Sequence, residues 1–131
     1  MASINFQILR QMLKKRIKSF GYAFKGIATL FRTQPNAWIH LTALLVVLVA
    51  GLFFKINTTE WCLIALTSAA VLATEAINTA IEFIIDLVSP QYHDLAGKAK
   101  DVAAAAVLLT AFGAVVVGFL IFFPKIAAIF H

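Results

Sequence analysis

The sequence holds few of the residues on which soluble enzymes and secreted domains usually depend. Only 13% of its 131 residues are charged, and six of these are acidic. The one cysteine, Cys62, has no partner within the chain, which excludes a disulfide scaffold. With 62% apolar residues the chain is also unlike a disordered protein. The mean hydropathy of +0.92 indicates a membrane protein instead.

Acidic residues are also absent from the whole N-terminal part of the chain, since none precedes Glu60. Seven of the eleven basic residues lie between Arg10 and Arg32. A basic segment directly before an apolar stretch is typical of contact with anionic lipid headgroups. Despite a pI of about 9.7, we therefore expect no nucleic-acid partner.

The standard motifs of nucleotide-binding and hydrolytic enzymes are missing. Gly21 and Gly26 have the spacing of P-loop glycines, but Ile27 and Ala28 stand where lysine and serine or threonine would be needed. The sequence has no His/Cys zinc spacing and no nucleophile elbow. Zinc chemistry and acyl-enzyme chemistry therefore have no support.

Three stretches are apolar and long enough to cross a bilayer, at residues 37–54, 61–85 and 102–123. About 20 helical residues cover a hydrocarbon core of roughly 30 Å. Residues 6–32 place apolar side chains at spacings of three and four and basic ones opposite them, which predicts an amphipathic surface helix. We expect a single all-α integral membrane domain over residues 1–131, with its basic N-terminus in the cytoplasm.

Four polar residues within and after the second predicted span form one helical face. With Glu75 at 0°, a step of about 100° per residue places Asn78, Glu82 and Asp86 within about 60° of it. A carboxylate in the bilayer centre costs at least about 2.5 to 3.5 kcal/mol, so such acids indicate function. The alternative is that Glu75 pairs with a basic neighbour and only fixes helix register.

Depth in the bilayer suggests what these acids do. Counting at about 1.5 Å per residue from Trp61 places Glu75 near the inner edge of the hydrocarbon core. Lys100 and Asp101 reach the same level from the following loop. A carboxylate that accepts a hydroxyl proton, oxygen ligands for Mg²⁺ and nearby cations suit phosphate transfer from a soluble nucleotide to a lipid hydroxyl.

These residues also carry a resemblance. Residues 75–82 (EAINTAIE), Asp86, residues 92–93 (YH) and residues 99–101 (AKD) resemble the signature of the prokaryotic diacylglycerol kinase family, which includes the undecaprenol kinases. The resemblance extends from about Lys15 through the third predicted span. It implies a membrane enzyme with three transmembrane helices in the bacterial cytoplasmic (inner) membrane. It also implies ATP as co-substrate, Mg²⁺, a membrane lipid substrate, and a homotrimer with active sites between neighbouring subunits at the cytoplasmic face.

The resemblance implies roles for individual residues. Glu75 looks like the catalytic base, and Glu82 like a Mg²⁺ ligand that also helps to hold the nucleotide. Asn78 and Asp86 look like supporting polar residues. The other positions that match nucleotide contacts are Lys15, Tyr22, Tyr92, His93, Lys100 and Asp101.

One departure concerns the metal. The family usually has a second metal-binding glutamate ahead of the first span, where this chain has Gln34. An amide oxygen can ligate Mg²⁺ but adds no charge, so we expect a lower metal affinity.

The substrate is left open between two lipids. Our main interpretation is a kinase that converts diacylglycerol to phosphatidic acid, and the alternative is an undecaprenol kinase. The surroundings of Tyr22 and His40 look nearer to the undecaprenol kinases. Rival interpretations are an ion-conducting subunit, whose conduit Glu75, Asn78 and Glu82 would line, and a catalytically silent relative.

Overall fold

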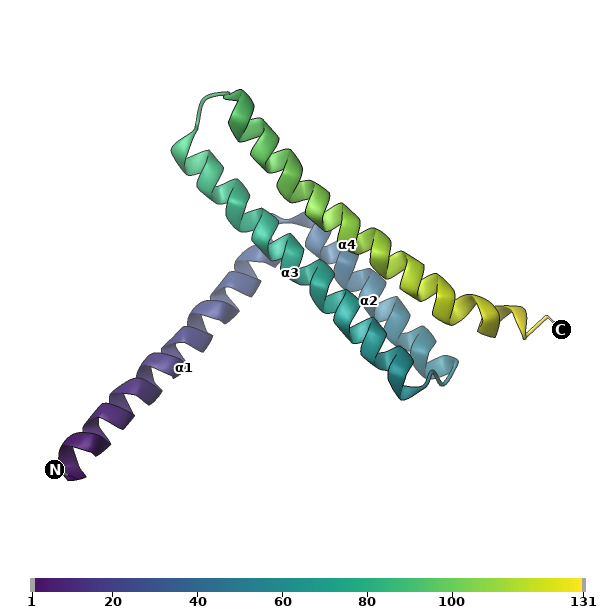
Figure 1. The fold of residues 1–131 in the computed structure, drawn as a ribbon, viewed down its shortest axis with the longest axis horizontal. Coiled ribbons are helices and arrows are strands. Elements are labelled where there is room, and N and C mark those ends of the chain that lie inside the picture. The colour runs from purple at the N-terminus through teal and green to yellow at the C-terminus, as the bar shows by residue number, and fades with distance from the viewer. Residues whose placement is uncertain (1, 131) are drawn as a thin grey trace. The chain divides into compact units, whose positions relative to one another are not determined.

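The computed structural model describes the backbone of residues 2–130 and the side chains of residues 6–130. This part of the chain forms four helices and no strand (Figure 1), which confirms the all-α prediction. The helices are α1 (Ala2–Thr33), α2 (Pro35–Phe53), α3 (Thr58–Val88) and α4 (Asp94–Ala127). They divide into two compact units, one formed by α1 and the other by α2, α3 and α4.

The first unit is one long amphipathic helix, and it contains the segment predicted as a surface helix. Apart from Leu30 and Phe31, its large described apolar side chains are exposed in the isolated chain, as expected for a helix that lies in a membrane interface. Lys15 and Tyr22 are both exposed on it. The Lys18 ammonium lies 5.9 Å from the centre of the Tyr22 ring, within the range of a cation–π contact.

The second unit is a three-helix arrangement in which α2 and α4 lie beside α3 (Figure 1). Among the described residues, two helices are long and apolar enough to cross a membrane, and these are α2 and α4. They contain the first and third predicted spans. The second predicted span lies within α3, and its passage through the bilayer stays a prediction.

The end of this unit at the α2–α3 turn is held by a reciprocal cap, and we call it the capped end. Asn57 Oδ1 accepts from the Glu60 backbone N–H at 3.0 Å, while the Asn57 backbone N–H donates to Glu60 Oε2 at 2.8 Å. This is a capping box, which satisfies two backbone donors at once. Lys125 at the end of α4 pairs with Glu60 Oε1 at 3.0 Å.

Apolar packing completes the capped end. Ile56, Ile64 and Ile121 form a buried cluster that draws one residue from the turn, one from α3 and one from α4. Gly51 on α2 is buried beneath the ring of Trp61, so the two helices approach closely there. The ends of all three helices are therefore fixed to one another.

At the other end, α3 and α4 continue beyond the first residue of α2 (Figure 1). Thr74 and Thr110 share a hydrogen bond of 2.9 Å between their hydroxyls, which sets the register of α3 against α4. Gln34 has an extended backbone because Pro35 follows it, and Pro35 is an ordinary first residue for a helix. This geometry directs Gln34 at α3, where the candidate site lies.

Candidate functional site

The predicted polar stripe exists on α3, and its members differ in burial. Glu75 is 1% exposed and Asn78 is 7% exposed. One and two turns further along, Glu82 is half-buried and Asp86 is exposed. The stripe therefore runs from the interior of the three-helix unit to its surface.

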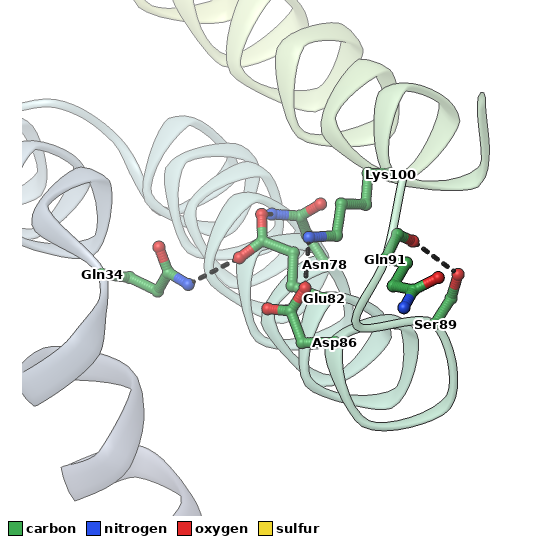
Figure 2. A network of polar contacts seen from close by, with 7 residues as sticks. All are labelled: Gln34, Asn78, Glu82, Asp86, Ser89, Gln91 and Lys100. Carbon is green, nitrogen blue, oxygen red and sulfur yellow. Dashed lines mark hydrogen bonds and ion pairs between the residues drawn. The ribbon is translucent and has the colours of Figure 1, made fainter. Parts of the chain in front are cut away.

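Two separate sets of polar contacts connect this stripe to Gln34, just ahead of α2, and to α4 (Figure 2). Asn78 Nδ2 donates to Glu82 Oε1 at 3.0 Å, and Gln34 Nε2 donates to Glu82 Oε2 at 2.8 Å. Lys100 on α4 pairs with Asp86 Oδ1 at 2.5 Å. We call the region that contains the stripe and its partners the polar end. It comprises Gln34, Glu75, Asn78, Glu82, Asp86 and Lys100.

Two buried oxygen atoms at the polar end have no hydrogen-bond partner in the described chain, namely Glu75 Oε1 and Asn78 Oδ1. Leaving a buried polar atom without a partner costs about 1 to 3 kcal/mol, and more for a charged group. Most buried polar atoms in folded proteins are therefore paired. Two orphan acceptors on neighbouring turns of one helix point to a ligand that would donate to them.

Both residues line a cavity of about 250 Å³ between α2, α3 and α4. Asn36 and His40 on α2 face the same cavity, and the α4 wall is made of apolar side chains that include Ala111. Neither Asn36 nor His40 is among the predicted site residues. The signal that could have found them is their spacing of four, which places both on one face of α2.

The polar end gathers only some of the predicted nucleotide contacts. Lys100 and Glu82 belong to it, whereas Tyr92 in the α3–α4 loop is 92% exposed and Asp101 is exposed. His93 caps α4, with its Nδ1 accepting from the Leu95 backbone N–H at 3.2 Å. Lys15 and Tyr22 lie on α1, the other unit.

The metal prediction rests on two residues that do contact each other. Among the described residues, no three His, Cys, Asp or Glu side chains gather closely enough to hold a metal ion. Gln34 directs its amide nitrogen, not its oxygen, at Glu82. Mg²⁺ is usually bound by only one or two carboxylates together with substrate phosphates and water. Glu82 would form such a set with Gln34 if the amide turned to present its oxygen to a metal that arrives with a nucleotide.

Comparison with known proteins shows the family to which the chain is similar. The family described as prokaryotic diacylglycerol kinase matches residues 21–122. The undecaprenol kinase of Bacillus subtilis is 38% identical over 117 residues, which cover 89% of this chain and 95% of that protein. The diacylglycerol kinase of Synechocystis is 38% identical over 91% of this chain and 69% of that protein. The diacylglycerol kinase of Escherichia coli is 30% identical over 100 residues, which cover 76% of this chain and 82% of that protein.

Proposed function

The chain belongs to the prokaryotic diacylglycerol kinase family and is a membrane lipid kinase that uses ATP, and from this premise we propose how its polar end works. Its acceptor is the hydroxyl of diacylglycerol, or in the alternative that of undecaprenol. The chain crosses the bacterial cytoplasmic membrane three times, with α3 as the second span. Its N-terminus and active site face the cytoplasm, and it acts as a homotrimer.

The observation that carries the mechanism is the unpartnered Oε1 of Glu75 in the small cavity. A buried carboxylate oxygen without a donor can accept a hydroxyl proton from a bound lipid. In the proposed step the lipid oxygen attacks the γ-phosphorus of ATP while its proton passes to Glu75 Oε1. The bond between the γ-phosphorus and the bridging oxygen breaks, and ADP leaves with that oxygen.

Neighbouring residues hold the reactants in place. Asn78 orients Glu82 through the hydrogen bond between them. Glu82 and Gln34 would hold Mg²⁺, which would neutralise phosphate charge when it is bound with the nucleotide. Lys100 supplies a positive charge within reach of the same region, since its partner Asp86 is exposed and can release it. The remaining nucleotide contacts that we propose are Lys15, Tyr22, Tyr92, His93 and Asp101.

A transfer assay tests this function. Purified full-length protein in detergent receives labelled ATP, Mg²⁺ and either diacylglycerol or undecaprenol, and labelled lipid is separated and counted. We expect transfer to at least one lipid, and loss of transfer in Glu75→Gln. Absence of transfer to either lipid would identify a catalytically silent relative. A Glu75→Gln variant with unchanged transfer would remove Glu75 from the mechanism.

A further inference from the structure

A second and larger cavity adjoins the one that contains Glu75. Its volume is about 490 Å³, and it lies between α2, α3 and α4 on the side toward the capped end. Its walls are apolar except for His40, Thr67 and Ser68. Cavities of about 300 to 1,000 Å³ with apolar walls and a few polar groups are typical of sites for small organic molecules.

The two cavities meet at His40 and Ala111, which line both of them. From this junction one side is apolar, while the other side contains Glu75 and Asn78 with their unpartnered oxygens. A molecule that spans the junction would therefore place hydrocarbon in the larger cavity and a polar end group beside Glu75. A lipid alcohol has this shape.

Of the three polar side chains in the larger cavity, His40 is the one that also lines the smaller cavity with Glu75. The Thr67 hydroxyl already donates within its own helix, to the Leu63 carbonyl at 2.8 Å and the Ile64 carbonyl at 3.2 Å. An imidazole offers one donor and one acceptor when it is neutral. His40 is half-buried and is thus placed to bind a hydroxyl at the point where the surroundings change from apolar to polar.

We propose that the larger cavity holds the hydrocarbon next to the acceptor hydroxyl, and that His40 binds this hydroxyl beside Glu75. The inference rests on the proposed function, favours undecaprenol over diacylglycerol as its acceptor, and makes His40 a determinant of that choice. A diacyl lipid would bring two ester carbonyls into this cavity, where Thr67 already donates within its helix and Ser68 is the one remaining hydroxyl donor in the lining. At least one carbonyl would then be buried without a partner, which is unfavourable. The site therefore selects an alcohol whose hydroxyl is followed directly by a hydrocarbon chain.

Kinetics of the full-length enzyme test the role of His40. With an isoprenoid alcohol as acceptor, His40→Ala should raise the KM for the alcohol about tenfold, as expected for one lost hydrogen bond. The KM for ATP should stay within about twofold, because the nucleotide does not contact His40 in this scheme. His40→Gln should recover most of the loss, since its amide also donates and accepts. Unchanged KM values in both variants would overturn the proposal.

A matched pair of substitutions tests the cavity. Ala114 lines the larger cavity, whereas Ala105 is exposed on the same helix and lines none of the described cavities. Ala114→Leu should raise the KM for the alcohol several-fold by filling the space, and Ala105→Leu should not. The effect of Ala114→Leu should grow with acceptor chain length. Equal effects of the two substitutions would count against this site.

Photolabelling locates the occupant without relying on turnover. An isoprenoid alcohol with a diazirine beside its hydroxyl should label cavity-lining residues, and excess unlabelled alcohol should suppress the label. If the enzyme transfers no phosphate, the proposed function fails while this labelling still decides the site. Label confined to other surfaces would overturn the inference. So would an intermolecular disulfide at Ala114→Cys in a Cys62→Ala background, because two copies would then meet at this wall and leave no room for a lipid chain.

Discussion

The two ends of the three-helix unit are built from similar residue types but differ in how completely those residues are satisfied. At the capped end, Asn57 and Glu60 exchange two hydrogen bonds, and Lys125 pairs with the same carboxylate. At the polar end, Glu82 receives two amide donors, yet Glu75 Oε1 and Asn78 Oδ1 receive none. The carboxylate at the capped end is thus paired within the chain, whereas two buried oxygens at the polar end have no partner among the described residues.

The capped end therefore stabilises the three-helix unit, whereas the polar end serves its function. Paired groups and close packing stabilise a fold, whereas an unpaired buried carboxylate destabilises it and is retained where it does chemistry. Substitutions at the capped end should therefore act on stability, and substitutions at the polar end should act on turnover. The following predictions test this division, beginning with the largest expected effect.

Glu75→Gln should reduce lipid phosphorylation by about a hundredfold to ten-thousandfold, the usual contribution of a general base. Thermal stability should not fall, because the substitution removes a buried carboxylate with one unpartnered oxygen and preserves its shape. Turnover and the melting temperature in detergent are measured on the same preparation. A large fall in melting temperature would mean that Glu75 stabilises the fold, and the contrast between the two ends would be lost.

Gly51→Ala at the capped end should lower thermal stability and leave turnover unchanged. A Cβ atom at this position would lie 2.6 Å from Trp61 Cη2 and 3.0 Å from Ile56 Cδ1, so the packed ring must shift. We expect a loss of about 1 to 3 kcal/mol in stability, as is typical of overpacking, with turnover per folded molecule retained. Gly113→Ala is the control, because nothing lies within 4 Å of its added Cβ. Equal melting temperatures for the two variants would refute the close approach.

Much of this arrangement could be predicted from the sequence because periodicity is local. The 100° step places Glu75, Asn78, Glu82 and Asp86 on one face whatever surrounds them, and the structure has them there. Three helices follow from apolar stretches and the first from an amphipathic pattern, with residues such as Pro35 and Asn57 at their boundaries. Both results depend only on residues close to each other in the chain.

Contacts between helices could not be predicted in the same way. His40 lies next to Glu75 only because α2 packs against α3 in one register, and the sequence of α2 shows merely a histidine in an apolar stretch. The pairing of Thr74 with Thr110 and the cover of Gly51 by Trp61 likewise depend on distant segments. The resemblance named residues with roles in a family, but it did not show which of them touch.

Gln34→Glu sharpens the comparison by adding a charge at the polar end. It would replace the 2.8 Å hydrogen bond between Gln34 and Glu82 with two facing carboxylates. Like charges at this distance are unfavourable until a cation lies between them. The Mg²⁺ concentration for half-maximal activity should therefore fall several-fold. Gln34→Ala serves as the control and should raise it, whereas an unchanged or raised requirement in Gln34→Glu would contradict a role of Gln34 in metal binding.

The smallest expected effect concerns pH at the capped end. The hydrogen bond from the Asn57 backbone lowers the pKa of Glu60 below its ordinary value of 4.5, and Lys125 lowers it further. The unfolded chain therefore binds more protons than the folded chain as the pH falls through this range. The stabilisation by ionised Glu60 is complete above pH 4.5 and is lost as the pH falls through the lowered pKa.

Melting temperatures of the full-length protein measured from pH 7 down to pH 3 should show this loss. Glu60→Gln should melt below the unsubstituted protein at neutral pH, and the two curves should converge in acid. Lys125→Gln is the informative control, because it keeps the bond from the Asn57 backbone, which is the larger cause of the shift. It should retain most of the pH dependence. If Lys125→Gln removes as much of it as Glu60→Gln does, the ion pair and not the helix cap holds this end together.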